Sequence, residues 1–355
     1  MFIPSVLDRL LRATLSLVLA CGATVAVAQL ERLPIKIGAS TGIEHVIAFI
    51  GVEQGVFAKH GLDAKLVMYT SGVEMINGLI SGAQDINIMG SIPFLAGASR
   101  GQPLVLIGHL SGDALAKSYS SHYSIVTAAG TPNTGIKEGD IKALKGKKIG
   151  LARGTGAEAY LLGLLSANGM KDSEVTIVNV AAANQATALR QGDVEAVSAW
   201  EPFGSQVSMR VPNAYRVISG SCDACYDPGA ILTTRGAIAS KAEQLRRFTV
   251  AFAEAQQILR KNYDAAADIN MRWIPGVDLD VMKVSIRRTV YDMRLSKNSV
   301  DGYNEKTIPM LVADKRMAMK LDAMTIVDPQ FYKHVEATAP QFFSDLKPIP
   351  ADRRL

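Results

Sequence analysis

Short apolar runs alternate along the chain with stretches in which apolar residues recur at helical spacing. Such strand-like runs and helix-like stretches follow one another through the first 200 residues, bounded by glycine-rich turns. Strands that alternate with helices form largely parallel sheets, so the pattern predicts an α/β fold. We expect strands at 35–38, 63–68, 86–90, 104–109, 148–151, 175–180 and 196–199, and helices at 44–59, 73–81, 157–167 and 184–191.

The two halves of this pattern repeat each other. A strand-like run and a glycine turn lead into Thr41-Gly42-Ile43-Glu44, and the same order leads into Thr155-Gly156-Ala157-Glu158. Further on, LISGAQDINIMGSIPF (79–94) resembles LRQGDVEAVSAWEPF (189–203). Because the two copies have similar lengths, the simplest interpretation is two α/β units built alike, each a lobe of the protein.

Two further apolar strands, at 122–128 and 229–234, bracket the second unit, and we expect them to cross between the lobes. From residue 240 onward the pattern is helical, with an apolar face that we expect to pack on the first lobe rather than form a third one. The predicted division is a leader at 1–28, a first lobe at 29–122 plus 232–355, and a second lobe at 123–231. The apolar helical face is made by Leu245, Phe248, Phe252, Ala255 and Leu259.

The N-terminus has the form of a secretory signal peptide. Arg9 and Arg12 precede an apolar run over 13–27, which ends in the small-residue site Ala26-Val27-Ala28. The run is shorter than a bilayer span, and no later stretch is long enough, so we expect a soluble exported protein in the periplasm. The segment Val18-Leu19-Ala20-Cys21 also resembles a lipoprotein box, and processing at Cys21 would leave a lipid-anchored protein instead.

Composition and charge argue against nucleic-acid binding, redox chemistry and a metal site. The 355 residues are 48% hydrophobic and carry a net charge of +5 with no basic tract, so nucleic acid is not an expected partner. Export leaves Cys222 and Cys225, whose Gly, Ser, Asp and Pro neighbours predict a loop with a small disulfide or two unreactive thiols rather than a redox site. The five histidines are scattered, so no metal site is expected.

Three turns match the pattern of a capping box, with Gly next after the hydroxyl residue: Thr41 to Glu44, Ser71 to Glu74 and Thr155 to Glu158. In such a turn the hydroxyl and the glutamate cap the helix, and the remaining amides of its first turn can hold an anion or a carbonyl oxygen. The turns follow strand ends, where α/β sheets bind ligands. The alternative is that these boxes cap helices and do nothing else.

The segment Gly154-Thr155-Gly156-Ala157-Glu158-Ala159 also fits a loose dinucleotide fingerprint, but its context excludes that interpretation. The glutamate places negative charge beside the amides, no phosphate-binding Lys follows, and the next strand ends at 178–181 without an acid. We therefore expect no cofactor.

Trp200-Glu201-Pro202 follows a short apolar strand. Either the indole and the carboxylate face a ligand, or Trp200 belongs to the core and Glu201 to a solvated turn. We find no nucleophile–base pair or paired-carboxylate constellation in the sequence.

Three segments carry a family resemblance: GVEQGVFAKHGLDAKLV (51–67), LKGKKIGLARGTG (144–156) and GDVEAVSAWEPF (192–203). Together they resemble the nitrate/sulfonate/taurine family of ABC-transporter substrate-binding proteins, over about residues 34–261. The resemblance implies a type II periplasmic binding protein: two α/β lobes, two crossing strands as a hinge and a solute in the cleft. It also implies a monomer, not an enzyme, whose partners are an inner-membrane permease and its ATPase.

The resemblance further implies a set of solute contacts and a range of solutes. Arg153 is the only cation among the cleft loops, so we expect an organic anion, such as a sulfonate or aromatic acid, or a heteroaromatic solute. The alternatives are a pyrimidine-binding protein of thiamine-precursor uptake, a sensor component, or a related pyrimidine synthase. That synthase carries a cysteine-rich stretch, and the only similar feature in this chain is the pair Cys222 and Cys225. The implied contacts are Ser40, Thr41, Gly42, Tyr69, Ser71, Gly72, Gly90, Ser91, Gly154, Thr155, Gly156, Trp200 and Glu201.

Overall fold

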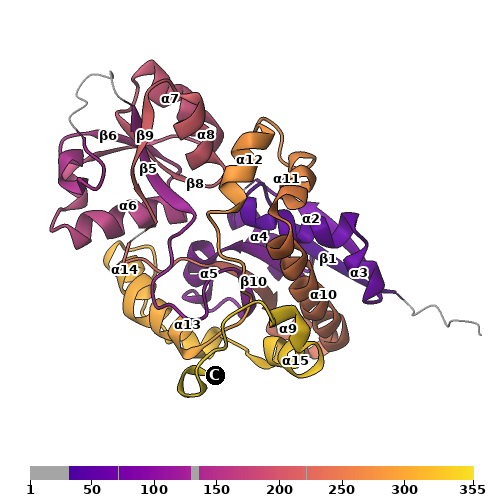
Figure 1. The fold of residues 1–355 in the computed structure, drawn as a ribbon. Coiled ribbons are helices and arrows are strands. Elements are labelled where there is room, and N and C mark those ends of the chain that lie inside the picture. Colours follow the sequence, from indigo (N-terminus) through magenta and orange to yellow (C-terminus); the bar gives the residue numbers. More distant parts are fainter. Residues whose placement is uncertain (1–31, 71, 129–135, 221) are drawn as a thin grey trace, which may run out of the picture. The chain divides into compact units, whose positions relative to one another are not determined.

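Two five-stranded sheets organise the computed structural model, which describes residues 32–70, 72–128, 136–220 and 222–355 (Figure 1). The first sheet has the strand order β2-β1-β3-β10-β4 and the second has the order β7-β6-β8-β5-β9. The strands are β1 (Leu33–Ala39), β2 (Leu62–Met68), β3 (Ile86–Gly90), β4 (Leu104–Ser111), β5 (Tyr123–Ala128), β6 (Lys148–Leu151), β7 (Thr176–Asn179), β8 (Ala196–Trp200), β9 (Ala214–Ser219) and β10 (Gly229–Thr234).

The two sheets have the same topology. In each sheet a first strand pairs in parallel with two neighbours, and a fourth strand, β10 or β5, runs antiparallel to the strands on both its sides. This arrangement confirms the predicted α/β class and the internal repeat, whereas the sheets are mixed, with two parallel and two antiparallel pairings in each. We call the first sheet and its helices lobe 1, and the second sheet and its helices lobe 2.

The connections between the lobes differ in detail from the prediction. Strands β5 and β10 lie inside the sheets, and the chain crosses in the segments before them, 112–122 and 222–228. The crossing segments pair with each other, because the Tyr119 amide donates to the Cys225 carbonyl and the Asp227 amide donates to the Tyr119 carbonyl, each at 2.9 Å. Strand β10 starts at Gly229 in the sheet of lobe 1, whereas the prediction assigned 229–231 to the second lobe.

The helices of the repeated units lie close to their predicted positions, with one break. The helix predicted over 44–59 is interrupted at Gly55, whose φ of +68° is a left-handed conformation that glycine adopts without strain. The elements are η1 (Ile43–His45), α2 (Val46–Glu53), α3 (Val56–Lys59), α4 (Gly72–Ile80), α5 (Ser91–Ala98), η2 (Ile141–Leu144), α6 (Gly156–Ala167), η3 (Asp172–Glu174), η4 (Ala182–Asn184), α7 (Gln185–Gln191) and α8 (Phe203–Arg210). Strand β9 and helices α5 and α8 were not predicted from the sequence.

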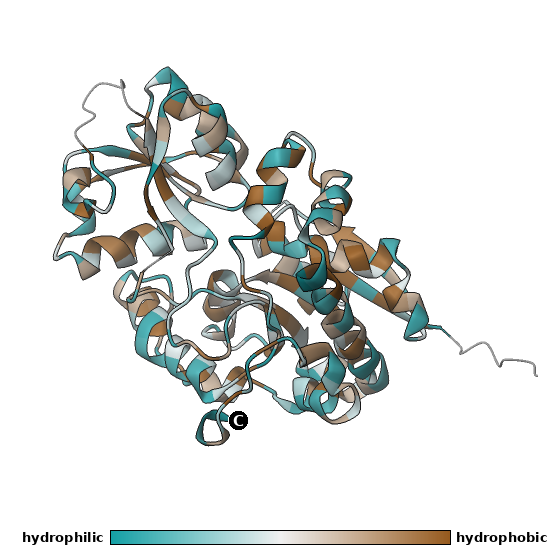
Figure 2. Cartoon of the chain, in the orientation of Figure 1, coloured by the Kyte–Doolittle hydropathy of each residue, from teal (hydrophilic) through white to brown (hydrophobic). Residues whose placement is uncertain are grey.

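The C-terminal third is helical, as predicted, and packs on lobe 1. Helix α10 buries Phe248 and Phe252 in the same hydrophobic cluster as β1, and Phe248 stacks on Phe57 of α3 with ring centroids 5.7 Å apart. Figure 2 shows the mixed hydrophobic and hydrophilic faces of this helix. The elements are α9 (Arg235–Ser240), α10 (Ala242–Lys261), α11 (Tyr263–Met271), α12 (Leu279–Ile286), α13 (Lys297–Gly302), the π-helical η5 (Tyr303–Thr307), α14 (Ile308–Ala313), η6 (Ala323–Ile326), α15 (Gln330–Thr338), η7 (Pro340–Phe343) and η8 (Ala351–Arg353).

The core of lobe 2 lies on both faces of its sheet. Side chains alternate along β5, so that Ile125 packs with the α6 side and Val126 with the α7 and α8 side. No helix among the described residues is both long and apolar enough to cross a bilayer. The predicted leader at 1–28, Cys21 and Ser71 lie outside the described residues.

Candidate functional site

The loops that follow the central strands of the two sheets meet each other. The turn after β1 in lobe 1 contacts the end of β8 in lobe 2, where the Ile43 amide donates to the Glu201 carbonyl at 3.3 Å. The glycine turns of the internal repeat sit at these strand ends. The carboxyl ends of the parallel strands therefore face one another across the lobe interface, which is where open α/β sheets bind their ligands.

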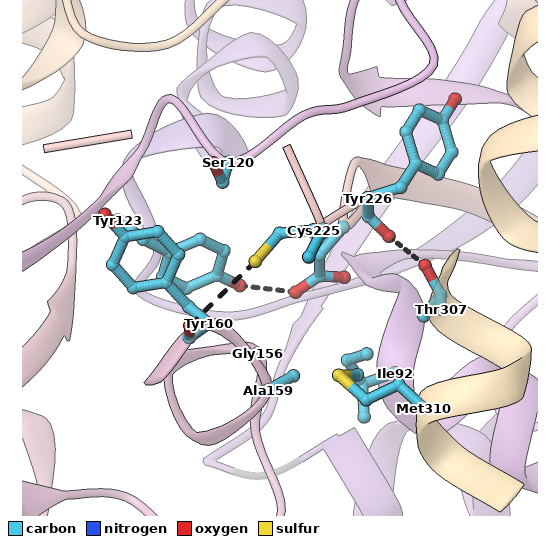
Figure 3. A pocket seen from close by; sticks show the side chains of 12 residues that line it. Ile92, Ser120, Tyr123, Gly156, Ala159, Tyr160, Cys225, Tyr226, Thr307 and Met310 are labelled. Carbon is cyan, nitrogen blue, oxygen red and sulfur yellow. Dashed lines mark hydrogen bonds between the residues drawn. The ribbon is translucent and has the colours of Figure 1, made fainter. Parts of the chain in front are cut away.

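A pocket lies at this interface, lined by α5, β5, α6, α14 and the second crossing segment (Figure 3). Ser120, Tyr123 and Asp227 are among the residues that line it, but the surface it exposes is almost entirely apolar and includes Ile92 and Met310.

Asp227 is the carboxylate of this pocket, and it is buried. The Ser91 hydroxyl and the Tyr123 hydroxyl each donate to it at 2.6 Å, one to each oxygen. Burial raises the pKa of Asp227, and the two hydrogen bonds oppose that rise. A β-carbon at Gly156 would lie 1.9 Å from an Asp227 oxygen and from the Tyr123 hydroxyl, so only glycine fits at this helix start.

Glu44 is a second buried acid, on the turn after β1. It is 8% exposed, and its Oε2 has no hydrogen-bond partner among the residues that the structure describes. Burial, with a smaller contribution from the charge of Asp227, raises its pKa to about 7. The neighbouring His45 accepts a hydrogen bond from the Ser40 amide at 3.2 Å, and burial lowers the pKa of His45 to about 3, so this histidine is neutral.

Aromatic rings pack around Tyr123, the hydrogen-bond partner of Asp227. His122 lies 4.0 Å from Tyr123 between ring centroids, and Tyr123 stacks on Tyr160 at 5.4 Å. Burial raises the pKa of Tyr119 to about 12, and the charge of Glu44 contributes to that rise. Burial and the same charge hold the pKa of Tyr291 well above its usual value. The site therefore combines negative charge with flat ring surfaces.

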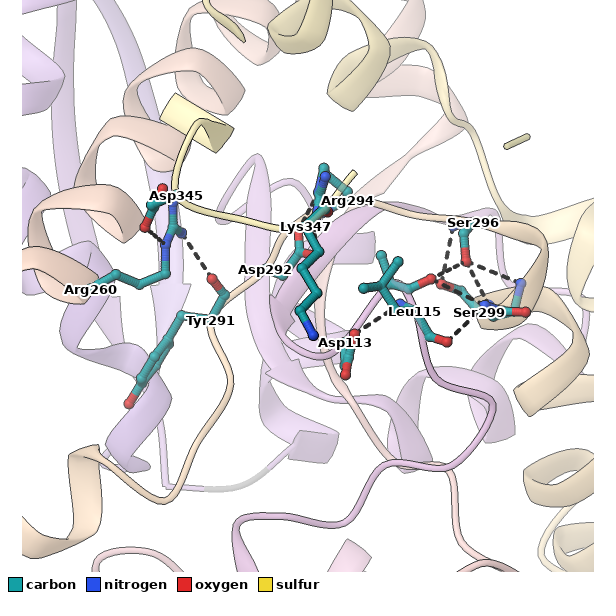
Figure 4. A network of polar contacts seen from close by, with 12 residues as sticks. Asp113, Leu115, Arg260, Tyr291, Asp292, Arg294, Ser296, Ser299, Asp345 and Lys347 are labelled. Atoms are coloured by element: carbon teal, nitrogen blue, oxygen red, sulfur yellow. Dashed lines mark hydrogen bonds and ion pairs between the residues drawn. The ribbon is translucent and has the colours of Figure 1, made fainter. Parts of the chain in front are cut away.

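Tyr291 is a further buried phenol. Its main-chain carbonyl accepts a hydrogen bond from Arg260 at 2.9 Å, while its ring points away from the ion pair of Arg260 with Asp345 (Figure 4). Within the described part of the chain the Tyr291 hydroxyl has no hydrogen-bond partner, although the residue is only 1% exposed.

The capping boxes predicted at Thr155 and Thr41 are wrong. The Thr155 hydroxyl donates back to the Ala152 carbonyl at 2.7 Å and does not cap α6, while Glu158 accepts from the Gly154 amide, four residues before it, at 2.8 Å. At the first turn, Thr41 is exposed and Gly42 is the cap position of η1 without a side-chain hydrogen bond. At the second turn, Glu74 accepts from the Thr70 hydroxyl at 2.9 Å.

The family resemblance also implies solute contacts at the end of β8, namely Trp200 and Glu201. The Glu201 carboxylate is 1% exposed; one oxygen pairs with Arg216 at 2.9 Å and Arg288 at 3.2 Å, and the other accepts from the Ser205 amide at 3.0 Å. Glu201 therefore contacts lobe 1 twice, through its carboxylate with Arg288 and through its main-chain carbonyl with the Ile43 amide. Trp200 is half-buried at the end of β8, with its ring edge-on to Phe203 at 5.9 Å.

The remaining implied contacts fall into two groups. Gly42, Ser91 and Gly156 are brought to the interface, and Gly90 has open space where a β-carbon would stand. In contrast, Tyr69 donates its hydroxyl to Gln84 at 2.6 Å, and Gly72 packs against Pro93 of α5, so both serve the interior of lobe 1.

Sequence reasoning missed the carboxylate of Asp227 and the rings of Tyr119, Tyr123, Tyr160 and Tyr291. They come from the crossing segments, β5, α6 and the C-terminal third, and no spacing in the sequence connects them. Cys222 and Cys225 form a disulfide on the crossing segment beside the pocket. The described residues contain no group of acids, histidines or cysteines that could hold a metal ion.

Comparison with known proteins adds a family and a fold. The family model described as "NMT1/THI5 like" matches residues 43–266. A protein of Bacillus subtilis named as an aliphatic sulfonates-binding protein is 28% identical over 326 residues, which cover 90% of this chain and 94% of that relative.

Solved structures share the two-lobed fold. The periplasmic aliphatic sulphonate binding protein SsuA from Escherichia coli superposes with a TM-score of 0.72 at 18% identity, covering 84% of this chain and 99% of that one. The desulfurization enzyme DSZB superposes with a TM-score of 0.67 at 15% identity, covering 86% and 99%. The fold is therefore that of periplasmic binding proteins, and it also occurs in an enzyme, so the fold alone does not decide between binding and catalysis.

Proposed function

This chain belongs to the NMT1/THI5-like family, and we propose that it is the solute-binding component of an ABC importer, acting by reversible binding rather than catalysis. Its relatives named as sulfonate-binding proteins support a solute-binding role. In this role the chain works as a monomer that passes a small organic solute to an inner-membrane permease and its ATPase.

The observation that carries this proposal is the buried carboxylate of Asp227 at the interface of two lobes that are joined by paired crossing segments. Asp227 lies on one crossing segment and receives hydrogen bonds from Ser91 of lobe 1 and Tyr123 of lobe 2. A solute bound at this point contacts both lobes at once, and such contacts favour the closed arrangement over an open one. We propose that lobe 1 comprises 33–111 and 229–355 and lobe 2 comprises 123–219, with the crossing segments as the hinge.

Two solute classes follow from different observations. The rings of Tyr123 and Tyr160 at the interface favour a heteroaromatic solute, because flat rings stack on one another. The names of the relatives favour an aliphatic sulfonate or another organic anion. We propose the heteroaromatic class first and keep the organic anion as the second candidate.

The test is ligand identification followed by blocking of the cleft. Mass spectrometry of what co-purifies with the protein, and a thermal-shift screen over pyrimidines, aromatic acids and sulfonates, should identify a solute that raises the melting temperature. Gly156→Ala should abolish that shift, because its methyl group overlaps Asp227 and Tyr123. Gly236→Ala is the matched control, since Gly236 lies in α9 with no close neighbour for a β-carbon and should keep the shift.

Two outcomes would contradict the proposal. If Gly156→Ala folds and binds the solute as wild type does, the site lies elsewhere. If the solute is converted to a product during incubation, the protein is an enzyme.

We propose that the protein is exported to the periplasm by its predicted leader and released after Ala28. The mass of the protein recovered from its native compartment should correspond to a chain that starts at Gln29. A mass for a chain that starts at a lipid-modified Cys21 would show an anchored protein instead.

A further inference from the structure

We propose that the disulfide between Cys222 and Cys225 is a reversible thiol-exchange site in the hinge. A small thiol reduces it, and reduction loosens the pairing of the two crossing segments. This inference goes beyond the proposed binding function, because it concerns the connection between the lobes and its test needs no solute. It is not a catalytic redox role, since the disulfide is itself the group that is modified.

The disulfide closes a loop too short to act mainly on global stability. Cys222 and Cys225 are only three positions apart in the sequence. A disulfide restricts the unfolded chain less when its loop is shorter, so this one contributes less to the free energy of unfolding than a disulfide over a long loop does. Its effect is therefore local: it fixes the turn in which the Cys225 amide donates to the Cys222 carbonyl at 3.0 Å.

This turn is where the second crossing segment pairs with the first. The Tyr119 amide donates to the Cys225 carbonyl at 2.9 Å, and the Cys222 amide donates to the Ser120 hydroxyl at 3.4 Å. Two residues after the turn, the Asp227 amide donates to the Tyr119 carbonyl at 2.9 Å. The disulfide thus stabilises the hydrogen bonds that hold the two halves of the hinge side by side, and opening it removes that support.

The sulfur of Cys225 is enclosed against lobe 2. A β-carbon at Gly163 of α6 would lie 2.6 Å from Cys225 Sγ and 3.4 Å from Cys222 Sγ, so the disulfide packs on this helix. Cys225 Sγ also lies 3.9 Å from the Tyr160 carbonyl (Figure 3). Of the two sulfur atoms, Cys225 Sγ is therefore the one closer to α6.

Cys222 borders a second cavity, which lies between the crossing segments. This cavity has a volume of about 210 Å³ and is lined by residues 118–121 of the first segment and by Cys222 and Asp223 of the second; we call it the hinge cavity. A water molecule occupies about 30 Å³ in the liquid, so the hinge cavity has room for a small thiol. Cys222 itself is only 4% exposed, which favours a small reagent over a folded protein as its reaction partner.

The exchange proceeds in two balanced steps. The thiolate of the reagent attacks Cys222 Sγ, the bond between the two cysteine sulfurs breaks, and Cys225 leaves as a thiolate that takes up a proton. A second thiolate then attacks the reagent sulfur of the mixed disulfide and releases the Cys222 thiolate, which is also protonated. Two reagent thiols end as one disulfide, and the protein gains two electrons and two protons. A small disulfide reverses both steps.

The first experiment tests whether the folded protein exchanges. The protein is incubated with dithiothreitol without denaturant, alkylated with N-ethylmaleimide and mapped by mass spectrometry. We expect alkylation of both Cys222 and Cys225 while the circular dichroism spectrum stays native. If alkylation occurs only at urea concentrations that unfold the protein, the disulfide is an inert structural bond and the inference is overturned.

Two single variants test the path of attack. Cys225→Ser leaves only the thiol beside the hinge cavity, and Cys222→Ser leaves only the thiol beside α6. The aromatic disulfide 5,5′-dithiobis(2-nitrobenzoate) should react several-fold faster with Cys225→Ser, after each rate is divided by the thiolate fraction obtained from its pH dependence. Equal rates, or a faster reaction of Cys222→Ser, would contradict entry through the hinge cavity.

Hydrogen exchange measures the effect of reduction on the hinge. The exchange rates of the Tyr119 and Asp227 amides should rise about fivefold or more in the reduced protein, which is the lower end of usual coupling between sites. Treatment with glutathione disulfide should restore the slow rates. The Asp85 amide of lobe 1 and the Val180 amide of lobe 2 are the controls, because each donates within its own lobe and should exchange as before.

The double variant Cys222→Ala with Cys225→Ala completes the test. Its Tyr119 and Asp227 amides should exchange fast from the start, and dithiothreitol should not change them. Unchanged rates at these two amides in the fully reduced wild-type protein would refute the role in the hinge. A similar rise at the control amides would also refute it, since the disulfide would then stabilise the whole fold instead. These readouts stand whether or not a solute is found, so they fail independently of the proposed function.

Discussion

Glu44, Glu74 and Glu158 occupy the same position in three similar turns, yet their surroundings differ. Glu158 is shared by Gly154, Arg153 and Arg316, and Glu74 bonds to Thr70 at the surface. Only Glu44 combines burial with an oxygen that has no partner in the described chain. The motif identified the residue, but the packing around it gave the residue its chemistry.

At the residue scale, the raised pKa of Glu44 predicts a pH-dependent stability. Between its ordinary pKa of 4.5 and its folded pKa of about 7, the native state holds a proton that the unfolded state releases. The free energy of unfolding therefore loses a contribution on the order of 3 kcal/mol as the pH rises through this range. Glu44→Gln lacks this loss, so its melting temperature relative to wild type should rise from pH 4.5 to pH 7.

Differential scanning calorimetry of both proteins over this pH range provides the measurement. The buried His45 and His122 act in the opposite direction, since their stabilisation is lost as the pH falls below 6.5, but both proteins share it and it cancels in the difference. In Glu254→Gln no such rise is expected, because Lys59 and His60 outweigh burial and hold the pKa of Glu254 low. A flat difference curve for Glu44→Gln would contradict the prediction.

At the element scale, helix starts in this protein carry their own carboxylates. Helices α5, α6 and α8 begin beside Asp227, Glu158 and Glu201. Such a carboxylate stabilises a helix start by satisfying free amides and by opposing the helix dipole. Here the carboxylates take up the Ser91 hydroxyl and the Gly154 and Ser205 amides, so these three groups are not free to bind a ligand.

A second element-scale feature joins α8 of lobe 2 to the start of α12, which packs with lobe 1. Arg210 pairs with Asp278 at 2.7 Å and also with Asp280, and Gln206 donates to the Gly276 carbonyl at 2.9 Å. These contacts stabilise the closed arrangement of the lobes from outside the pocket.

Arg210→Ala should therefore weaken solute binding without touching the solute. Exposed ion pairs contribute up to about 1 kcal/mol, which corresponds to a loss of affinity of up to about fivefold. The control is Arg272→Ala, because Arg272 makes a similar exposed pair with Glu53 inside lobe 1. Titration calorimetry with the identified solute should show weaker binding only for Arg210→Ala, and equal affinities in the two variants would contradict a role in closure.

At the scale of the whole molecule, the two sheets have the same topology. The chain passes from lobe 1 to lobe 2 and back through the two crossing segments. The antiparallel strand of each sheet directly follows a crossing, which explains why 122–128 and 229–234 resemble connections in the sequence. The hydrogen bonds between Tyr119 and the second crossing segment hold the two connections side by side. A hinge of two paired segments allows the lobes to separate while their sheets stay intact.

The sequence by itself determined the α/β class, the internal repeat, most of the strands and the helical packing face of α10, because these depend on local periodicity. It also located the turns at the interface. Strand β9 and helix α8 were missed because short elements with mixed burial have weak patterns.

Only the tertiary structure decided the charge of the site. Ser91 and Asp227 are 136 residues apart, and Arg316 reaches Glu158 from the C-terminal third. Whether a carboxylate is neutralised, hydrogen-bonded or left without a partner depends on such distant neighbours and on burial, which no local pattern contains. For that reason the sequence indicated an anion-binding turn, whereas in the folded chain carboxylates of the protein accept hydrogen bonds beside α6 and α8, and Glu44 is buried with an oxygen that has no partner among the described residues.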